Sequence, residues 1–97
     1  MPNSYGEILT ARGGTYILND TSTYNTSLVY AIVTLEDTEF SILEITDSNG
    51  IVTDVINDHF ADLLTPIKAG AIITPMDVSK PFSSIELASG SVTLVLK

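Results

Sequence analysis

The sequence predicts a mainly β protein, a small antiparallel β-sandwich or barrel of the jelly-roll type with at most one short helix. Short segments rich in β-branched and aromatic residues recur along the 97 residues, and clusters of Ser, Asn, Gly and Pro separate them. The closing segment alternates apolar and polar residues, as a half-buried strand does. The length predicts one core and a single β domain over residues 15–97, preceded by an N-terminal arm over residues 1–14.

The first half of the chain predicts three strands. Thr15–Asn19 is short and rich in β-forming residues, and Asp20–Ser27 is dense in Ser, Thr and Asn, which predicts a loop. Leu28–Leu35 is apolar at nearly every position, so we expect a central strand buried on both faces. Glu39–Thr46 alternates with a slip at Ile42–Leu43, which indicates a β-bulge.

The middle of the chain is ambiguous between helix and strand. Asp47–Gly50 reads DSNG and predicts a turn, because Asn and Gly tolerate positive φ. The apolar residues that follow have helical spacing, so we expect a short helix near Asp54–Leu64, capped by Thr53 and ended by Pro66. Their β-branched content favours a strand instead. Ala69–Pro75 predicts a further short strand.

The closing segment, FSSIELASGSVTLVLK, predicts a hairpin with a two-residue turn at Ser89–Gly90. This turn would place Leu87 opposite Val92 and Ile85 opposite Leu94. One face of the hairpin is then apolar, and it carries Ile85, Leu87, Val92, Leu94 and Leu96. The other face carries Ser84, Glu86 and Thr93, with Val95 as the exception.

The charge of the chain is strongly negative, at −8, from twelve acids and four bases. The bases are scattered, which disfavours nucleic acid as a partner because phosphate binding depends on a clustered basic patch. No apolar run reaches the length of a membrane span, and the polar start MPNSYGE is unlike a signal peptide, so we expect neither a membrane partner nor secretion. The absence of cysteine excludes disulfides and thiolate metal sites.

Few residues offer chemistry. His59 is the only histidine, with Asp58 and Asp62 nearby, and we interpret it as a surface residue on a polar helix face rather than a metal ligand or acid–base group. We therefore expect no enzyme activity, no catalytic residue, no metal and no cofactor. Asp20–Ser22, reading DTS, resembles the active-site triplet of retroviral-type aspartic peptidases, but Asn19 intervenes before it and Ser22 stands where that family has Gly. A peptidase stays a remote alternative.

The later part of the chain resembles small virion proteins of tailed bacteriophages, of the capsid decoration (cement) type. The segments that carry the likeness are IKAGAIITP (67–75) and FSSIELASGSVTLVL (82–96), together with AIVTLEDTEFSIL (31–43). The resemblance covers Ala31–Leu96 except the region around His59, and the chain departs from it at Thr93–Val95, where that group ends more polar, and in its longer Asp54–Leu64 stretch.

This resemblance implies a structural protein that binds the outer surface of a phage capsid and stabilises it. The implied partner is the major capsid protein, the implied location is the virion after synthesis in the host cytoplasm, and the implied assembly is a homotrimer at three-fold positions. A tail or fibre component is the alternative, in which Tyr16, Tyr24 and Tyr30 bind sugars.

The N-terminal arm is the candidate contact region. Its residues Glu7, Ile8, Leu9 and Thr10 can form a strand, and Arg12 can pair with an acid on a partner. We expect the strand to add to an exposed sheet edge of a neighbouring subunit or of the capsid, with Gly13–Gly14 as a hinge. Attachment to an edge of its own domain is the other possibility.

Overall fold

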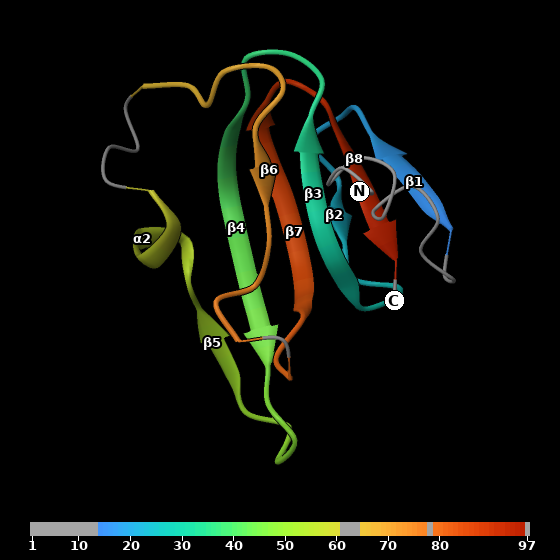
Figure 1. Ribbon diagram of the computed structural model, residues 1–97, viewed down its shortest axis with the longest axis vertical. Coiled ribbons are helices and arrows are strands. Elements are labelled where there is room, and N and C mark those ends of the chain that lie inside the picture. Colours follow the sequence, from blue (N-terminus) through green and yellow to red (C-terminus); the bar gives the residue numbers. More distant parts are fainter. Residues whose placement is uncertain (1–13, 61–64, 78, 97) are drawn as a thin grey trace, which may run out of the picture.

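The computed structural model of the protein describes residues 14–60, 65–77 and 79–96, which form eight strands and one short helix (Figure 1). The strands are β1 (Thr15–Leu18), β2 (Thr23–Tyr24), β3 (Val29–Thr34), β4 (Glu39–Thr46), β5 (Val52–Asp54), β6 (Ile72–Ile73), β7 (Phe82–Ser89) and β8 (Val92–Leu96), and the helix is α2 (Ile56–His59). Every strand pairing is antiparallel. The predicted mainly β, antiparallel fold is therefore confirmed.

The strands form one sheet that divides into two halves. Their order is β1-β8-β3-β7-β4-β5, with β2 added to β7 and β6 added to β3. At the centre, β3 and β7 share only the pair Val29–Phe82. Beyond this pair the two strands part, and β6 takes the edge of β3 while β2 takes the edge of β7. One half is thus β1, β8, β3 and β6, and the other is β5, β4, β7 and β2.

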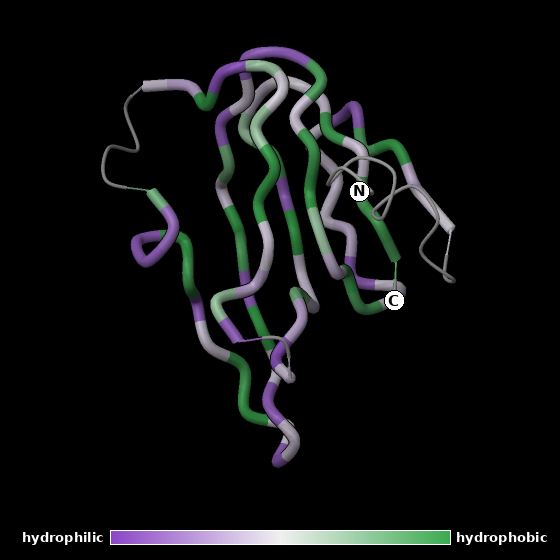
Figure 2. Tube along the Cα trace, in the orientation of Figure 1, coloured by the Kyte–Doolittle hydropathy of each residue, from purple (hydrophilic) through white to green (hydrophobic). Residues whose placement is uncertain are grey.

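The two halves differ in charge. The residues of β1, β3, β6 and β8 include no Asp, Glu, Lys or Arg, and we call this part the neutral half. The other four strands carry Glu39, Glu44, Asp54 and Glu86 and no basic residue, and we call this part the acidic half. Figure 2 shows the resulting difference in hydropathy, with apolar residues following one another along β3 and β8.

The core lies between the inner faces of the two halves. The neutral half contributes Leu18, Val29, Ile32, Ile73, Val92 and Leu94, and the acidic half contributes Tyr24, Leu43, Phe82, Ile85 and Leu87. Val55 and Ile56, at the start of α2, close one side of this core. Burying each large apolar side chain contributes about 1.5–3 kcal/mol, so this single cluster supplies most of the driving force for folding.

Two predictions about individual strands hold in the structure. β3 is buried on both faces, as its continuous apolar run predicts, and only Tyr30 within it is exposed. β4 spans Glu39–Thr46 as predicted, and its register with β7 shifts at three places, between Glu39 and Phe40, between Phe40 and Ile42, and between Glu44 and Ile45. The strand is therefore irregular, but the register is unbroken at Ile42–Leu43, where the bulge was predicted. The DSNG turn is also present and joins β4 to β5, with Gly50 at φ +80°.

The predicted closing hairpin is wrong. β7 pairs with β4 and β2, whereas β8 lies between β1 and β3, so the chain crosses from the acidic half to the neutral half at Gly90. The inward faces were nevertheless assigned correctly: Ile85, Leu87, Val92 and Leu94 are all buried, and Leu96 is half-buried. Alternation determines which side chains face a core whatever strand lies alongside, and for this reason it cannot identify the partner.

The predicted helix over Asp54–Leu64 is wrong in extent. The helix α2 has four residues, and Phe60 after it is extended; residues 61–64 lie outside the described part. Thr53 belongs to β5 and is not a cap; the Asp54 carboxylate instead accepts a hydrogen bond from the Ile56 N–H at 2.9 Å. The β-branched residues at 51–53 fit a strand better than a helix, so the helix begins later than predicted. A two-residue strand, β2, also lies inside the predicted loop over 20–27.

Candidate functional site

The outer face of the neutral half is apolar across four strands. Residues paired across neighbouring strands project to the same face, so Ile17, Thr93 and Val33 form one row, which Ile72 of β6 extends. Thr15, Val95 and Ala31 form a second row beside it. We call these two rows the neutral face.

Burial on the neutral face is greatest at its centre. Ala31, Val33 and Val95 are buried yet do not belong to the core cluster, because they point away from it. At the ends of the first row Ile17 is 57% exposed and Ile72 is 37% exposed. Neither row contains an acid or a base, and depletion of charged residues is a property of the buried centre of protein interfaces.

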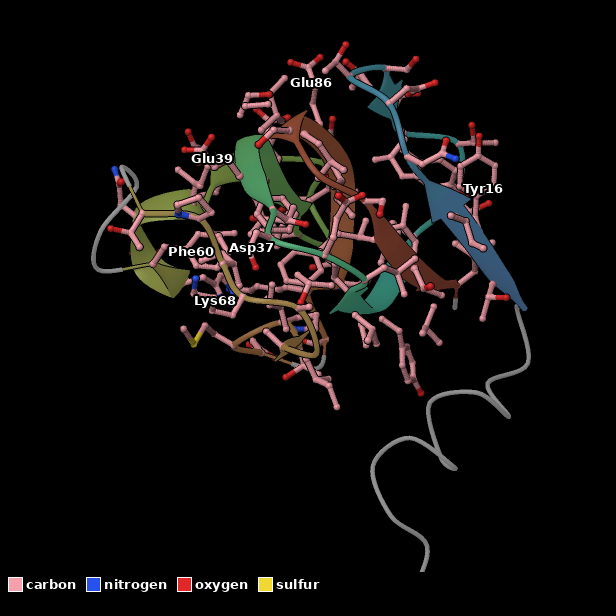
Figure 3. The ribbon with its side chains drawn as sticks, turned by 90° about the horizontal axis from the view of Figure 1, so that it is seen from above. Tyr16, Asp37, Glu39, Phe60, Lys68 and Glu86 are labelled. Carbon is pink, nitrogen blue, oxygen red and sulfur yellow. The ribbon has the colours of Figure 1, made fainter. Side chains whose placement is uncertain are left out.

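The outer face of the acidic half is polar and negatively charged. The Glu86 carboxylate accepts a hydrogen bond from Thr23 Oγ1 of β2 and another from Ser41 Oγ of β4, the latter at 2.8 Å. These two bonds lower the pKa of Glu86, so this carboxylate stays ionised at a lower pH than an ordinary glutamate. Figure 3 shows the side chains of Glu39 and Glu86 directed away from the body of the protein.

The end of the molecule where β3 turns into β4 holds further acids. Ser91 Oγ donates to Glu36 Oε2 at 2.7 Å, and the exposed Lys68 Nζ lies 3.4 Å from Asp37 Oδ2. These exposed pairs contribute little to stability. They show that the acids of this loop are satisfied by neighbouring side chains of the same chain.

A groove of about 270 Å³ lies beside α2. Its lining residues are Ile45, Thr53, Val55, Asp58, His59, Met76, Asp77 and Lys80. The His59 ring centroid lies 5.4 Å from that of Phe82 and 6.1 Å from that of Phe60, so the histidine is half-buried against aromatic rings rather than fully on the surface as predicted. Burial lowers the pKa of His59, and the charge of Asp58 partly opposes this effect.

The residues considered for chemistry are not brought together. Within the described ranges, no three His, Asp or Glu side chains are grouped so that they could hold a metal ion. Asp20 lies in an exposed turn, where Oδ1 accepts a hydrogen bond from the Ser22 N–H at 2.9 Å and the pKa of the carboxyl is lowered.

The tyrosines considered for sugar binding occupy different environments. Tyr24 is only 8% exposed and its ring centroid lies 4.7 Å from that of Tyr16, so Tyr24 belongs to the core. Tyr16 and Tyr30 are about half exposed, at 47% and 49%. Tyr24 is therefore removed from the candidate binding residues, and the other two remain.

The predicted contact residues Glu7, Ile8, Leu9, Thr10 and Arg12 lie outside the described residues. The structure instead reveals the neutral face, which the sequence analysis did not identify. Its signal was present, since Thr15–Leu18, Val29–Thr34 and Val92–Leu96 lack charges in a chain of net charge −8. The strand order that places these segments side by side was not visible, because the closing hairpin was predicted in its place.

Comparisons with known proteins add no relative: neither a family model, nor a curated protein, nor a solved structure matches the chain. Within residues 14–60, 65–77 and 79–96, no helix has the length and apolar character needed to cross a bilayer.

Proposed function

We propose that this protein is a structural component of a virus particle, a capsid decoration (cement) protein that docks through the neutral face and turns its acidic half to solvent. The observation that carries the proposal is the separation of charge between the two halves of one small sheet. Four acids lie on the strands of one half and no charged residue lies on the strands of the other.

The physical argument concerns desolvation. A charged side chain loses its hydration when a partner covers it, so the centre of a protein interface is depleted of charge. Covering the neutral face removes water from Ile17 and Ile72 and dehydrates no ionised group on those strands. Covering the acidic half would bury Glu44 and Glu86, which costs several kcal/mol for each carboxylate left without a positively charged partner.

The resemblance to phage virion proteins supplies the kind of partner. It implies the major capsid protein as the surface that the neutral face meets, a homotrimer as the assembled form, and no nucleic acid or membrane in the contact. The charge of −8 fits this role, since like-charged free subunits repel one another and stay soluble before they dock.

The first test is the number of copies in a particle. Quantitative mass spectrometry of purified virions should give a copy number in fixed ratio to the major capsid protein, as a shell component requires. A copy number far below that of the capsid protein would overturn the proposal and favour the tail or fibre alternative, for which Tyr16 and Tyr30 remain available as exposed aromatic side chains.

The second test compares two edge strands. Ile17→Asp alters β1 of the neutral half, and Val52→Asp alters β5 of the acidic half; the two side chains are equally exposed, at 57% and 56%. We expect Ile17→Asp to weaken binding to capsids that lack the protein by about tenfold or more, since it places a charge in the contact, and Val52→Asp to have little effect. Ile72→Asp, on β6, should act like Ile17→Asp. Equal binding by all three variants, each checked for an unchanged melting temperature, would contradict docking through the neutral face.

A further inference from the structure

The turn between β4 and β5 carries the pair Asn49–Gly50. The Asp47 N–H donates to the Ile51 carbonyl at 3.1 Å and so closes a loop of three residues. Within this loop the Gly50 N–H donates to the Asp47 carbonyl at 3.0 Å, and Gly50 has φ +80°. This is a common hairpin connection, in which a turn ends in a glycine with left-handed backbone.

An asparagine followed by glycine is chemically labile. The backbone nitrogen of the second residue can attack the side-chain amide carbon of the asparagine, and a side chain on that second residue hinders the approach. Gly50 has no side chain, so it offers the least hindrance. Asn49 is the only asparagine of the chain that precedes a glycine; the other four precede Ser4, Asp20, Thr26 and Asp58.

The surroundings of this pair leave room for the reaction. Ser48, Asn49 and Gly50 are all exposed. Apart from the residues adjoining Gly50 in the chain, no heavy atom lies within 4 Å of a Cβ built on it. Water therefore reaches both the side-chain and the backbone carbonyl of Asn49, and no neighbouring segment prevents the turn from changing its shape.

Asp47 opposes the reaction by holding the turn closed. Its Oδ1 accepts hydrogen bonds from the Asn49 N–H at 2.9 Å and from the Ile51 N–H at 3.0 Å. Together with the bond from the Gly50 N–H to the Asp47 carbonyl, three successive backbone donors are bound to this one residue. The Gly50 nitrogen must leave its bond and turn toward Asn49 Cγ before it can attack, so the turn has to open first.

We propose that Asn49 is a site of spontaneous deamidation and that Asp47 sets the rate of this modification by holding the turn closed. The Gly50 nitrogen forms a bond to Asn49 Cγ, the Cγ–Nδ2 bond breaks, and the proton of the Gly50 N–H leaves with Nδ2 as ammonia. One water molecule then opens the cyclic imide at either of its two carbonyl groups. The product at position 49 is aspartate, or it is isoaspartate, in which the backbone runs through the former side chain.

The modification changes the acidic half of the sheet. Both products add one negative charge to a chain whose net charge is −8, and isoaspartate also lengthens the backbone of the turn by one methylene group. Loop length fixes the register of a hairpin, and β5 has only three residues with which to pair with β4. The isoaspartate form should therefore show faster hydrogen exchange in β5. This inference is independent of the proposed function.

Peptide mapping by mass spectrometry measures the reaction in the full chain, stored folded at mildly alkaline pH. We expect the peptide that contains Asn49 to gain about 1 Da, because an amide NH2 is replaced by OH. The peptide that contains Asn57, in α2, should keep its mass. Asn49→Gln should abolish the gain, since the longer side chain would have to close a larger and less favourable ring. No gain at Asn49, or an equal gain at Asn57, would overturn the proposal.

Variants of Asp47 test what sets the rate. Asp47→Ala removes the acceptor of two of the three hydrogen bonds and should accelerate deamidation about fivefold. Asp47→Asn removes the charge but keeps a side-chain oxygen as acceptor, so its rate should stay close to that of the unaltered chain. In urea that unfolds the protein, all three chains should react at a similar, faster rate, because the turn is absent. Equal rates for the folded Asp47→Ala and unaltered chains, or a folded rate as fast as the unfolded one, would contradict the role of Asp47 and overturn the proposal.

Discussion

The neutral and acidic halves pack their inner faces into the same core but have different outer surfaces. Each has four strands, and the inner faces of both contribute apolar side chains to one core. Their outer faces differ: Ile17, Val33 and Val95 lie on one, whereas Ser41, Glu44 and Glu86 lie on the other. The centre of the outer neutral face is already buried within the single chain, at Ala31, Val33 and Val95, and its ends at Ile17 and Ile72 are exposed. The absence of charge on this face, compared with the acids on the other, is the reason that we propose docking through the neutral half.

The largest expected effect separates the two faces of the neutral half. Leu94 points into the core and is completely buried, whereas Thr93 lies in the outer row and is half-buried. Leu94→Asp should unfold the protein, because an unpaired buried carboxylate costs several kcal/mol, comparable to the total stability of a small domain. Thr93→Asp should fold, with a change of about 1 kcal/mol or less.

Thermal melts followed by circular dichroism measure this pair. Similar melting temperatures for the two variants would show that the inward and outward faces of β8 are assigned incorrectly. Under the proposed function, Thr93→Asp should also weaken capsid binding, so it separates docking from folding at a single position.

The next effect concerns the crossing between the halves. Gly90 has φ +94°, and a Cβ added there would lie 2.4 Å from Thr38 Oγ1 and 2.6 Å from the Asp37 carbonyl oxygen. Gly90→Ala should destabilise the protein by roughly 2–5 kcal/mol, the sum of a left-handed backbone cost and overpacking against the buried Thr38 and the backbone of Asp37.

Gly50→Ala is the matched control for that substitution. Gly50 also has a positive φ, +80°, but no atom lies within 4 Å of the added Cβ. It should cost only the backbone term, about 1–2 kcal/mol. Urea unfolding of both variants measures the difference, and equal losses would mean that the crossing at Gly90 is not tightly packed.

The smallest effect is a pH dependence at the side of the acidic half. Burial against Phe82 lowers the pKa of His59, so the folded state favours the neutral imidazole. This contribution to stability is complete above the unfolded pKa of about 6.5, and it is lost as the pH falls through the lower folded pKa.

Protonation of His59 should lower the stability of the protein as the pH falls just below about 6.5. This loss should be absent in the His59→Gln variant. Carboxylates with a lowered pKa, such as Glu86 and Asp77, lose their contribution only at more acidic pH, near 4 and below, so the two effects separate. Melting temperatures between about pH 7 and pH 5 provide the measurement. An identical slope in the two proteins would show that the His59 ring is not desolvated in the folded state.

The sequence predicted which residues face the core better than it predicted which strands meet. Alternation identified Ile85, Leu87, Val92 and Leu94 as inward because a side chain responds to the layer beneath it, a local property. Ser89–Gly90 was interpreted as a hairpin turn, and Gly90 does adopt the positive φ that such a turn requires. Whether the chain forms a hairpin at Gly90 or crosses to the other half depends on contacts with Asp37 and Thr38, about fifty residues away. The residues around Gly90 give no sign of those contacts.

The candidate site was missed for a related reason. The neutral face combines residues from segments that begin at Thr15, Val29, Ile72 and Val92, and the absence of charge in each segment alone is unremarkable. It becomes a surface only when β8 lies between β1 and β3. The predicted contact segment, Glu7–Thr10, lies outside the described residues, so its contact with a partner stays a prediction.

The position of β8 also governs when the chain can fold during its synthesis. Of the strands in the described residues, β8 is the last to leave the ribosome, yet it pairs with both β1 and β3. The strands β4, β5 and β7 can associate earlier, whereas β1 and β3 emerge first and then wait without a partner between them. Such long-range closure is slow and leaves strand edges open to other nascent chains. The yield of folded protein therefore depends on β8 emerging and inserting faster than neighbouring chains can pair with β1 and β3.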